Sequence, residues 1–257
     1  MSEAQSGTAL REAIARRKAG GEPALVAFIT AGYPRRDDFR KQLEAVGAAA
    51  DIVEIGVPFT DPMADGATIQ RSSQAALEQG VTLQWILEEL TRARHQASPL
   101  VLMSYLNPLM AFGLERLADA VAAAGVCGFI VPDLPVDEAD ELRDALDTRR
   151  VALIQMVTPV TTAPRRAQLL QASRGFVYAV TMTGTTGREV TVPEATLEYL
   201  REVRAGSPLP VCAGFGIRSK AQVERLAGVV DGVIVGSALV EALEQGRDPQ
   251  EFLQSLR

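Results

Sequence analysis

Short apolar runs alternate with longer segments in which apolar residues recur at helical spacing. Most of the runs are apolar at nearly every position, which is typical of parallel strands covered on both faces. The segments between them, such as LERLADAVAAAG and KAQVERLAG, are amphipathic at a helical period and often end in Gly. We predict strands over 24–30, 51–56, 99–105, 128–133, 151–157, 175–181, 209–215 and 231–237.

The spacing of these strands predicts how they are arranged. One strand follows another after roughly thirty residues, the size of a βαβ unit. The 257 residues show no linker, low-complexity segment or break in composition. We therefore expect an α/β protein with one domain over residues 1–257, a (β/α)8 TIM barrel with a short N-terminal helix, rather than an open doubly wound sheet. Residues 56–79 and 181–194 are interpreted as two long loops after the second and sixth strands.

Composition narrows the classes of function. Hydrophobic residues make up 47% and charged residues 23%, and the net charge of −6 argues against nucleic acid or an anionic membrane as the main partner. We expect a cytoplasmic protein, because no apolar run approaches the ~18 residues of a membrane span and the first residues lack a signal peptide's apolar core. Cys127 and Cys212 are expected to be reduced thiols. His95 is the only histidine, so no His-ligated metal cluster is expected.

An acidic pair is the main chemical signal. Side chains alternate along a strand, so Glu54 in DIVEIG shares a face with Ile52 and points into the barrel near its mouth. A structural ion pair is the alternative, but no predicted strand offers an obvious inward cation. A carboxyl group in an apolar setting has a raised pKa and can exchange protons near neutral pH. Asp65 in ADG by itself suggests only a turn, but beside Glu54 it predicts an ionised partner with a separate duty.

Glycine-bearing turns follow the last three strands and predict a phosphate site. They read GTTG (184–187), GFGIRS (214–219) and GSAL (236–239). Glycine lets backbone N–H groups approach an anion, and helix N-termini favour negative charge. Ser237 would add a hydroxyl, or cap the last helix, or do both. Apolar and aromatic residues expected to face inward near the mouth, either as barrel core or as a slot for an aromatic ring, are Phe28, Met103, Tyr105, Ile130, Met156, Tyr178 and Phe215.

The motifs FITAGYP, VEIGVPFTDPMADG, SYLNPL, VPDLPV, TGTTG, CAGFGI and VIVGSAL occur in this order along the chain. In order and spacing they resemble the α subunit of tryptophan synthase over essentially the full length. The second motif is highly specific to that family. The resemblance implies a lyase of tryptophan biosynthesis that cleaves indole-3-glycerol phosphate into indole and glyceraldehyde 3-phosphate, a retro-aldol reaction that needs neither metal nor Schiff base.

Carried over residue by residue, the resemblance assigns roles within the site. Glu54 would be the proton shuttle, and Asp65 would accept the indole N–H and stabilise positive charge on the ring. Phe28, Tyr105 and Phe215 would form the walls of the indole site, Tyr178 would lie near the glycerol portion, and Thr186 would bind Asp65 when the loop closes. Phosphate would be held by Gly187, Gly216, Gly236 and Ser237.

The resemblance also implies a partner. The loops after strands 2 and 6 would face a β subunit, with Asp61, Pro62 and Gly184 as candidate contacts, in an α2β2 heterotetramer. This chain would need no cofactor, because pyridoxal phosphate belongs to the β subunit. Thr185, where an aliphatic residue is usual, and Ala67, where Pro is frequent, depart from the family pattern in these loops. A stand-alone lyase that releases free indole and a non-catalytic regulatory barrel remain the alternatives; a metal-dependent sugar-phosphate epimerase would lack its histidine ligands.

Overall fold

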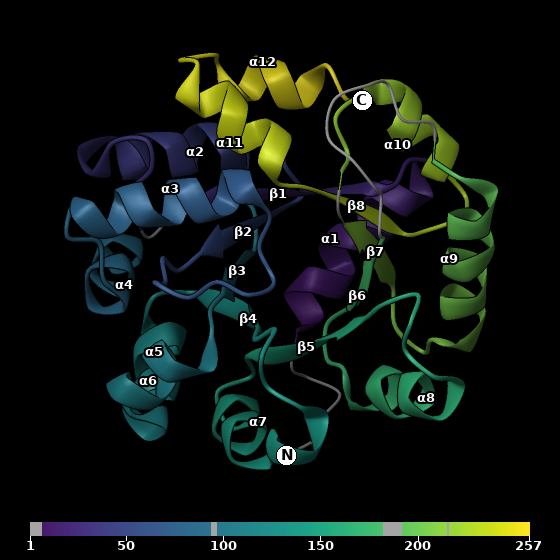
Figure 1. The fold of residues 1–257 in the computed structure, drawn as a ribbon, viewed down its shortest axis with the longest axis horizontal. Helices are drawn as coiled ribbons and strands as arrows, with labels where there is room; N and C mark the ends of the chain where they lie inside the picture. Colours follow the sequence, from purple (N-terminus) through teal and green to yellow (C-terminus); the bar gives the residue numbers. More distant parts are fainter. Residues whose placement is uncertain (1–6, 94–96, 182–191, 215) are drawn as a thin grey trace.

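Eight parallel strands close into a barrel in chain order (Figure 1). The computed structural model describes residues 7–93, 97–181, 192–214 and 216–257. Each strand pairs with the next, and β1 pairs with β8 to complete the ring. The predicted (β/α)8 barrel is confirmed. The strands are β1 (Ala24–Thr30), β2 (Ile52–Gly56), β3 (Leu100–Met103), β4 (Val126–Ile130), β5 (Ala152–Val157), β6 (Val177–Val180), β7 (Val211–Gly214) and β8 (Gly232–Val235).

Helices other than α1 surround the ring of strands on its outer side (Figure 1). No helix in the described part of the chain is both long and apolar enough to pass through a membrane. The α-helices are α1 (Thr8–Ala19), α2 (Phe39–Ala49), α3 (Ala67–Glu78), α4 (Leu83–Arg92), α5 (Leu106–Phe112), α6 (Leu114–Ala123), α7 (Asp140–Asp147), α8 (Ala163–Ala172), α9 (Glu194–Gly206), α10 (Lys220–Leu226), α11 (Ser237–Glu244) and α12 (Pro249–Gln254), and the 3-10 helices are η2 (Arg36–Asp38) and η3 (Val136–Glu138).

The alternation of side chains along each strand separates two apolar layers. On β2, Val53 and Ile55 belong to the large cluster between the strands and the helices, whereas Ile52 belongs to the cluster inside the barrel. Every residue of β1 and β2 is buried. Burial on both faces explains why these strands are apolar at almost every position. It also fixes the direction of Glu54, which lies on the same face as Ile52.

Helix α1 closes the N-terminal end of the barrel. Its buried residues Leu10, Ala13 and Ile14 belong to the interior cluster, together with Val26 and Ile52. Figure 1 shows α1 in the middle of the ring of strands. The predicted N-terminal helix therefore exists, and it serves as a plug. Because chemistry in such barrels takes place at the opposite, C-terminal end of the strands, the plug leaves that end available.

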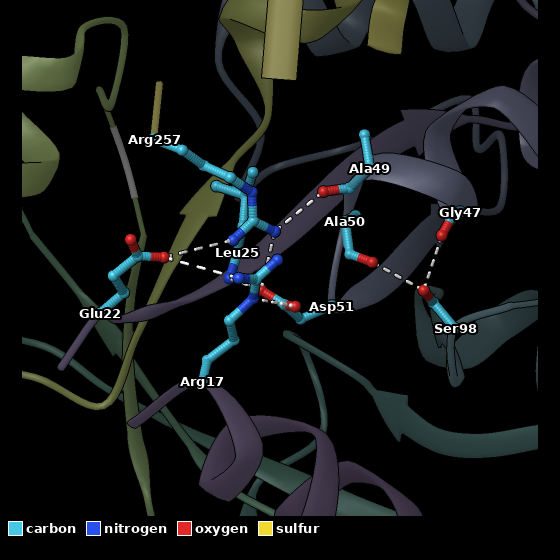
Figure 2. Close-up of polar contacts among 9 residues, drawn as sticks. All are labelled: Arg17, Glu22, Leu25, Gly47, Ala49, Ala50, Asp51, Ser98 and Arg257. Carbon is cyan, nitrogen blue, oxygen red and sulfur yellow. Dashed lines mark hydrogen bonds and ion pairs between the residues drawn. The ribbon is translucent and has the colours of Figure 1, made fainter. Parts of the chain in front are cut away.

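A carboxylate at the start of β2 fastens the plug (Figure 2). Asp51 accepts hydrogen bonds from the backbone N–H of Leu25 at 2.8 Å and from Nε of Arg17, near the end of α1, at 2.7 Å. Arg257 donates to the same carboxylate at 3.0 Å and to the carbonyl of Ala49 at 2.9 Å. The Asp51 side chain is only 13% exposed, so these charge-assisted bonds compensate for its burial.

The start of β8 repeats this arrangement. Asp231 accepts from the backbone N–H of Val211 at 3.0 Å and pairs with Lys18 at 2.9 Å and Arg204 at 3.0 Å. Arg17 and Lys18 are neighbours in the last turn of α1. The half-buried Asp51 binds the first and the buried Asp231 binds the second, so both aspartates hold this turn of the plug.

The segment after β2 differs from the prediction. We expected a loop over 56–79, but α3 occupies Ala67–Glu78, so the loop ends at Gly66. The buried face of α3 includes Ser72 and Ser73, whose hydroxyls bond to Thr30 and to the backbone of Phe59. Two serines on the buried face weaken the apolar period that would have predicted the helix.

Several strand boundaries also differ. The last three strands, expected over 175–181, 209–215 and 231–237, cover Val177–Val180, Val211–Gly214 and Gly232–Val235. The third strand was expected over 99–105 but ends at Met103, and Tyr105 caps the start of α5. The fourth was expected over 128–133 but covers Val126–Ile130. Pro132, without a backbone N–H, follows its end, as expected of a residue that cannot continue a sheet ladder. The differences in the third and fourth strands shorten them at the mouth and leave more chain in the loops there.

Candidate active site

Glu54 lies inside the barrel close to its C-terminal mouth. It is the third residue of β2, opposite Phe28 on β1 and Val101 on β3. Its side chain is 1% exposed, and its Oε2 atom has no hydrogen-bond partner among the described residues. Burial, together with the negative charge of Asp65, raises the pKa of Glu54 to about 8. The group is therefore largely protonated at neutral pH.

Asp65 lies in the loop between β2 and α3, where several hydrogen bonds fix its backbone. Its N–H donates to the carbonyl of Pro62 at 3.2 Å, and its carbonyl accepts from the side-chain amide of Gln70 on α3 at 2.8 Å. The phenol of Tyr105 accepts from the N–H of Ala64 at 2.9 Å. The ring of Tyr105 also stacks on Phe59, with centroids 5.0 Å apart. Tyr105 thus anchors the loop from the start of α5, just after β3.

The carboxyl group of Asp65 has a different environment from that of Glu54. It is half-buried, and burial raises its pKa to about 6, while a hydrogen bond from Tyr105 lowers it. Asp65 is therefore mostly ionised at neutral pH, where Glu54 is mostly protonated. The predicted division between a protonated and an ionised carboxyl group has a physical basis in these two environments.

Tyr178 on β6 completes the buried acidic centre. Burial raises the pKa of its phenol, and the charges of Glu54 and Asp65 raise it further. The three groups therefore lie within electrostatic reach of each other, and Tyr178 stays a neutral hydrogen-bond donor. The sequence pattern placed Tyr178 among the inward aromatic residues, and the family resemblance placed it near the glycerol portion of the substrate.

Two aromatic rings at the mouth lie across glycines of the adjacent strands. A Cβ atom on Gly56, the last residue of β2, would stand 2.5 Å from Cζ of Phe28. A Cβ atom on Gly214, the last residue of β7, would overlap the hydroxyl and ring of Tyr178. Each glycine therefore makes room for a ring from the preceding strand. These glycines were not predicted as site residues, although their position at strand ends was a usable signal.

The predicted phosphate residues lie at the ends of β7 and β8. Gly216 is exposed, with φ +81°, a conformation that favours glycine. Its carbonyl accepts from the side chain of Gln222 at 3.1 Å, which ties it to α10. Gly236 is the N-cap of α11 and Ser237 is its first residue, and both are half-buried.

The expectation that Ser237 caps the last helix was wrong on two points. The cap position belongs to Gly236, and α12 follows α11. The structure shows no side-chain cap bond at this helix start. Among the described residues, no side chain caps the first N–H groups of α11, at the end of the helix that favours anions.

Several predicted residues fall outside the described parts of the chain. These are Gly184, Thr186, Gly187 and Phe215, together with the departure at Thr185 and the single histidine, His95. Of the remaining partner candidates, Asp61 is exposed and Pro62 is half-buried in the β2–α3 loop. Ala67 is exposed at the first position of α3. Cys127 and Cys212 are free thiols, half-buried and buried respectively.

Comparison with known proteins gives a consistent result. Residues 14–256 match the family model described as tryptophan synthase alpha chain. A protein of that name from Nitratidesulfovibrio vulgaris is 44% identical over 252 residues, covering 97% of this chain and 98% of that protein. A second relative of the same name, from Chloroflexus aurantiacus, is 42% identical over 239 residues, with 92% of this chain and 90% of that protein covered.

Solved structures agree with the sequence relatives. A structure of Mycobacterium tuberculosis tryptophan synthase matches with a TM-score of 0.90 at 37% identity, covering 98% of this chain and 97% of that one. The tryptophan synthase subunit alpha of Legionella pneumophila matches with a TM-score of 0.85 at 32% identity, with 96% of both chains covered.

The burial of Glu54 predicts an unusual dependence of stability on pH. Because its pKa is about 8 in the folded chain and about 4.5 when unfolded, the unfolded state loses the proton first as the pH rises. The contribution of Glu54 is thus fully favourable below pH ~4.5 and is lost progressively up to pH ~8. Glu54→Gln, which cannot ionise, should raise the free energy of unfolding by roughly 3–4 kcal/mol at pH 8 and by almost nothing at pH 4. Urea denaturation at pH 4, 6 and 8 checks this, and a difference independent of pH would contradict it.

Proposed function

Because this chain belongs to the tryptophan synthase alpha chain family, we propose that it cleaves indole-3-glycerol phosphate into indole and glyceraldehyde 3-phosphate in tryptophan biosynthesis. The observation that carries this proposal is the pair of carboxyl groups at the barrel mouth. Glu54 is protonated and Asp65 ionised at the same neutral pH. A retro-aldol cleavage through acid–base chemistry needs one group of each kind.

Glu54 moves the proton in this scheme. Cleavage requires that the indole carbon bearing the side chain gain a proton and that the adjacent hydroxyl lose one. As the carbon–carbon bond breaks, its electron pair returns to the ring system and the hydroxyl carbon becomes the aldehyde. Protonated Glu54 donates to the ring carbon and afterwards accepts the hydroxyl proton, so it returns to its starting state. A pKa of about 8 suits both steps.

Asp65 stabilises the charge that develops on the ring. When the ring carbon is protonated, the indole nitrogen becomes more acidic and carries partial positive charge. An ionised carboxylate that accepts the indole N–H stabilises that charge. The hydrogen bond from Tyr105 opposes the effect of burial on the pKa of Asp65 and so helps keep it ionised.

The walls of the mouth fit the rest of the substrate. Phe28 and Tyr105 supply aromatic surface for the indole ring, and the neutral phenol of Tyr178 can donate a hydrogen bond to the glycerol hydroxyls. The N-terminus of α11 with Ser237, and Gly216 after β7, supply N–H and hydroxyl donors for phosphate. Thr186, Gly187 and Phe215 are included in this proposal only because the family resemblance assigns them to the substrate site.

A partner on the mouth side is supported by exposed apolar side chains. Among the described residues, the large hydrophobic side chains that are strongly exposed are Met63 at 87%, Val160 at 76% and Met110 at 53%. They follow β2, β5 and β3 respectively, so all three lie in segments at the C-terminal face of the barrel. Strongly exposed apolar side chains on one face are a feature of interaction surfaces. Asp61 and Pro62 lie in the same loop as Met63.

A cavity next to this face extends the surface. It measures about 510 Å³ and lies between the segments after β4 and β5, with Leu134, Val136, Val160 and Leu169 among its lining residues. We propose that this face binds the β subunit in an α2β2 assembly. The alpha chain itself would use no cofactor in the scheme above, pyridoxal phosphate being a property of the β subunit. Two free thiols and a role in amino-acid biosynthesis support a cytoplasmic location.

Substitution of either carboxyl group should remove cleavage while leaving the fold intact. Glu54→Gln should lower kcat by about 10²–10⁴-fold, because it removes the proton shuttle. Asp65→Asn should lower it by about 10²–10³-fold, because it removes the charge opposite the ring. Glu44→Gln, on the outer surface of α2, is the matched control and should be unaffected.

The wild-type pH profile belongs to the same test: kcat/KM should rise through pH ~6 as Asp65 ionises and fall above pH ~8 as Glu54 loses its proton. Indole release from indole-3-glycerol phosphate measures all of these quantities. Wild-type turnover in the Glu54→Gln variant would sink the assignment, and no cleavage by the wild-type chain under any condition would favour a non-catalytic barrel.

The partner proposal has a separate test. Indole release should be weak for the chain alone and should rise strongly when a tryptophan synthase β subunit is added. Met63→Glu should raise the β concentration needed for half-maximal stimulation by about tenfold, since it places a charge in an apolar contact. Gln254→Glu, an equal charge change at an exposed position on α12, should not. High activity that β leaves unchanged would make the chain a stand-alone lyase.

A further inference from the structure

A polar network at the rim of the mouth links the Asp65 segment to the phosphate end. At its centre is Glu241 on α11, which contacts two other elements of the barrel. One carboxylate oxygen accepts a hydrogen bond from the hydroxyl of Thr68 at 3.1 Å, and the carboxylate also pairs with the guanidinium of Arg218. The Glu241 side chain is 28% exposed. These three residues come from α3, α11 and the segment after β7.

One arm of the network leads to Asp65. Thr68 is the second residue of α3, three positions after Asp65. The first turn of the same helix carries Gln70, whose side chain donates to the Asp65 carbonyl at 2.8 Å and whose N–H donates to the Gly66 carbonyl at 3.0 Å. The first turn of α3 therefore helps to fix the backbone that carries the Asp65 carboxylate.

The other arm leads to the phosphate end. Glu241 is four residues after Ser237, so the two side chains lie on the same face of α11. Arg218 lies two residues after Gly216, and the Gln222 side chain ties both together by accepting from the Arg218 N–H at 2.7 Å and donating to the Gly216 carbonyl at 3.1 Å. The ion pair between Arg218 and Glu241 thus spans the gap between the two elements expected to hold phosphate.

We propose that Glu241 is a positioning residue that couples occupation of the phosphate end to the placement of Asp65. This inference rests on the proposed function of the site. An anion held jointly by Gly216 and the start of α11 fixes these two elements relative to each other. The Arg218–Glu241 pair is then held in one geometry, and the Glu241 carboxylate holds Thr68 and the first turn of α3. A substrate without its phosphate group would leave Asp65 less well placed.

The same two helices offer an internal control. Arg71 on α3 and Glu244 on α11 form a second pair at 2.8 Å. It joins α3 to α11 as Glu241 does, but Glu244 is more exposed, at 38%, and makes no contact with Thr68 or Arg218 among the described interactions. If Glu241 merely docked one helix on the other, the two carboxylates would be equivalent.

The experiment compares the full-length variants Thr68→Val, Glu241→Ala and Glu244→Ala with the wild type. Hydrogen–deuterium exchange of peptides covering residues 64–71 is followed with and without glycerol 3-phosphate as the probe for the phosphate end. Exchange does not depend on turnover, so it tests the coupling even if the cleavage reaction is wrongly assigned. In parallel, kcat and KM for indole-3-glycerol phosphate are measured.

In the wild type, glycerol 3-phosphate should slow exchange in these peptides, and in Glu244→Ala it should do the same. Thr68→Val should bind the probe within twofold of wild type, lose the slowing and lower kcat about tenfold with KM unchanged. That factor corresponds to one lost hydrogen bond to a charged group. In Glu241→Ala, the probe should no longer slow exchange, and kcat should fall to a similar extent. KM should also rise, because this variant removes the contacts with both Thr68 and Arg218.

Equal effects of Glu241→Ala and Glu244→Ala would overturn the proposal in favour of simple helix docking. So would probe binding without slowed exchange in the wild type, or failure of the wild type to bind the probe. If Glu241→Ala does not fold, Thr68→Val decides, and retention of both slowed exchange and kcat in that variant would overturn the coupling. Loss of cleavage in the wild type with the exchange response intact would refute the reaction and not the coupling.

Discussion

The chemistry of this barrel depends on one buried carboxyl group that has no cation paired with it in the described parts of the chain. Glu54 is withdrawn from water, and the charge of Asp65, which acts on it, is also negative. Both effects disfavour its ionised form. A carboxyl group in this position costs free energy of folding at neutral pH, so the rest of the chain has to supply stability elsewhere. The same environment lets Glu54 exchange protons near neutral pH, where the enzyme would work.

The opposite end of the barrel holds carboxylates in a contrasting arrangement. There α1 fills the interior with apolar side chains. Asp51 accepts from a strand N–H and from Arg17 in the last turn of α1 (Figure 2), and Asp231 accepts from a strand N–H and pairs with Lys18 in the same turn. In contrast to Glu54, these carboxylates are fully paired. A buried carboxyl group thus serves stability at one end of the barrel and reactivity at the other, according to whether a cation faces it. Glycines at the mouth, by making room for Phe28 and Tyr178, leave that end with surface shaped for a ligand.

Local patterns in the sequence predict much of this arrangement. Continuous apolar runs predict all eight strands. Strands that are buried on both faces are apolar at nearly every position, so they can be recognised without an alternating pattern. The position of Glu54 within its run predicts its direction. Helix α3 was missed because serines occupy two of its buried positions, and their hydroxyl contacts with Thr30 and Phe59 cannot be read from the sequence.

Contacts between distant parts of the chain were not predictable at all. The bond between Thr68 and Glu241 joins residues 173 positions apart. The tie between Tyr105 and the Asp65 loop depends on where β3 ends, and that boundary was placed two residues too late. The roles given to individual residues came from the resemblance to a family. The comparisons support the family itself, with relatives that are 40–45% identical to this chain. The sequence predicted the apolar setting of Glu54, but the half-buried setting of Asp65 and its hydrogen bond from Tyr105 came only from the three-dimensional structure.

The most direct test is to observe the protonation of Glu54 itself. Carboxyl-labelled ¹³C-glutamate can be introduced and the Glu54 resonance, assigned from its absence in Glu54→Gln, followed by NMR from pH 4 to pH 10. The account predicts a midpoint near pH 8 that moves to lower pH in Asp65→Asn, because that variant removes the adjacent negative charge. A midpoint near the ordinary value of about 4.5 in both proteins would contradict the claim that Glu54 is a buried proton shuttle.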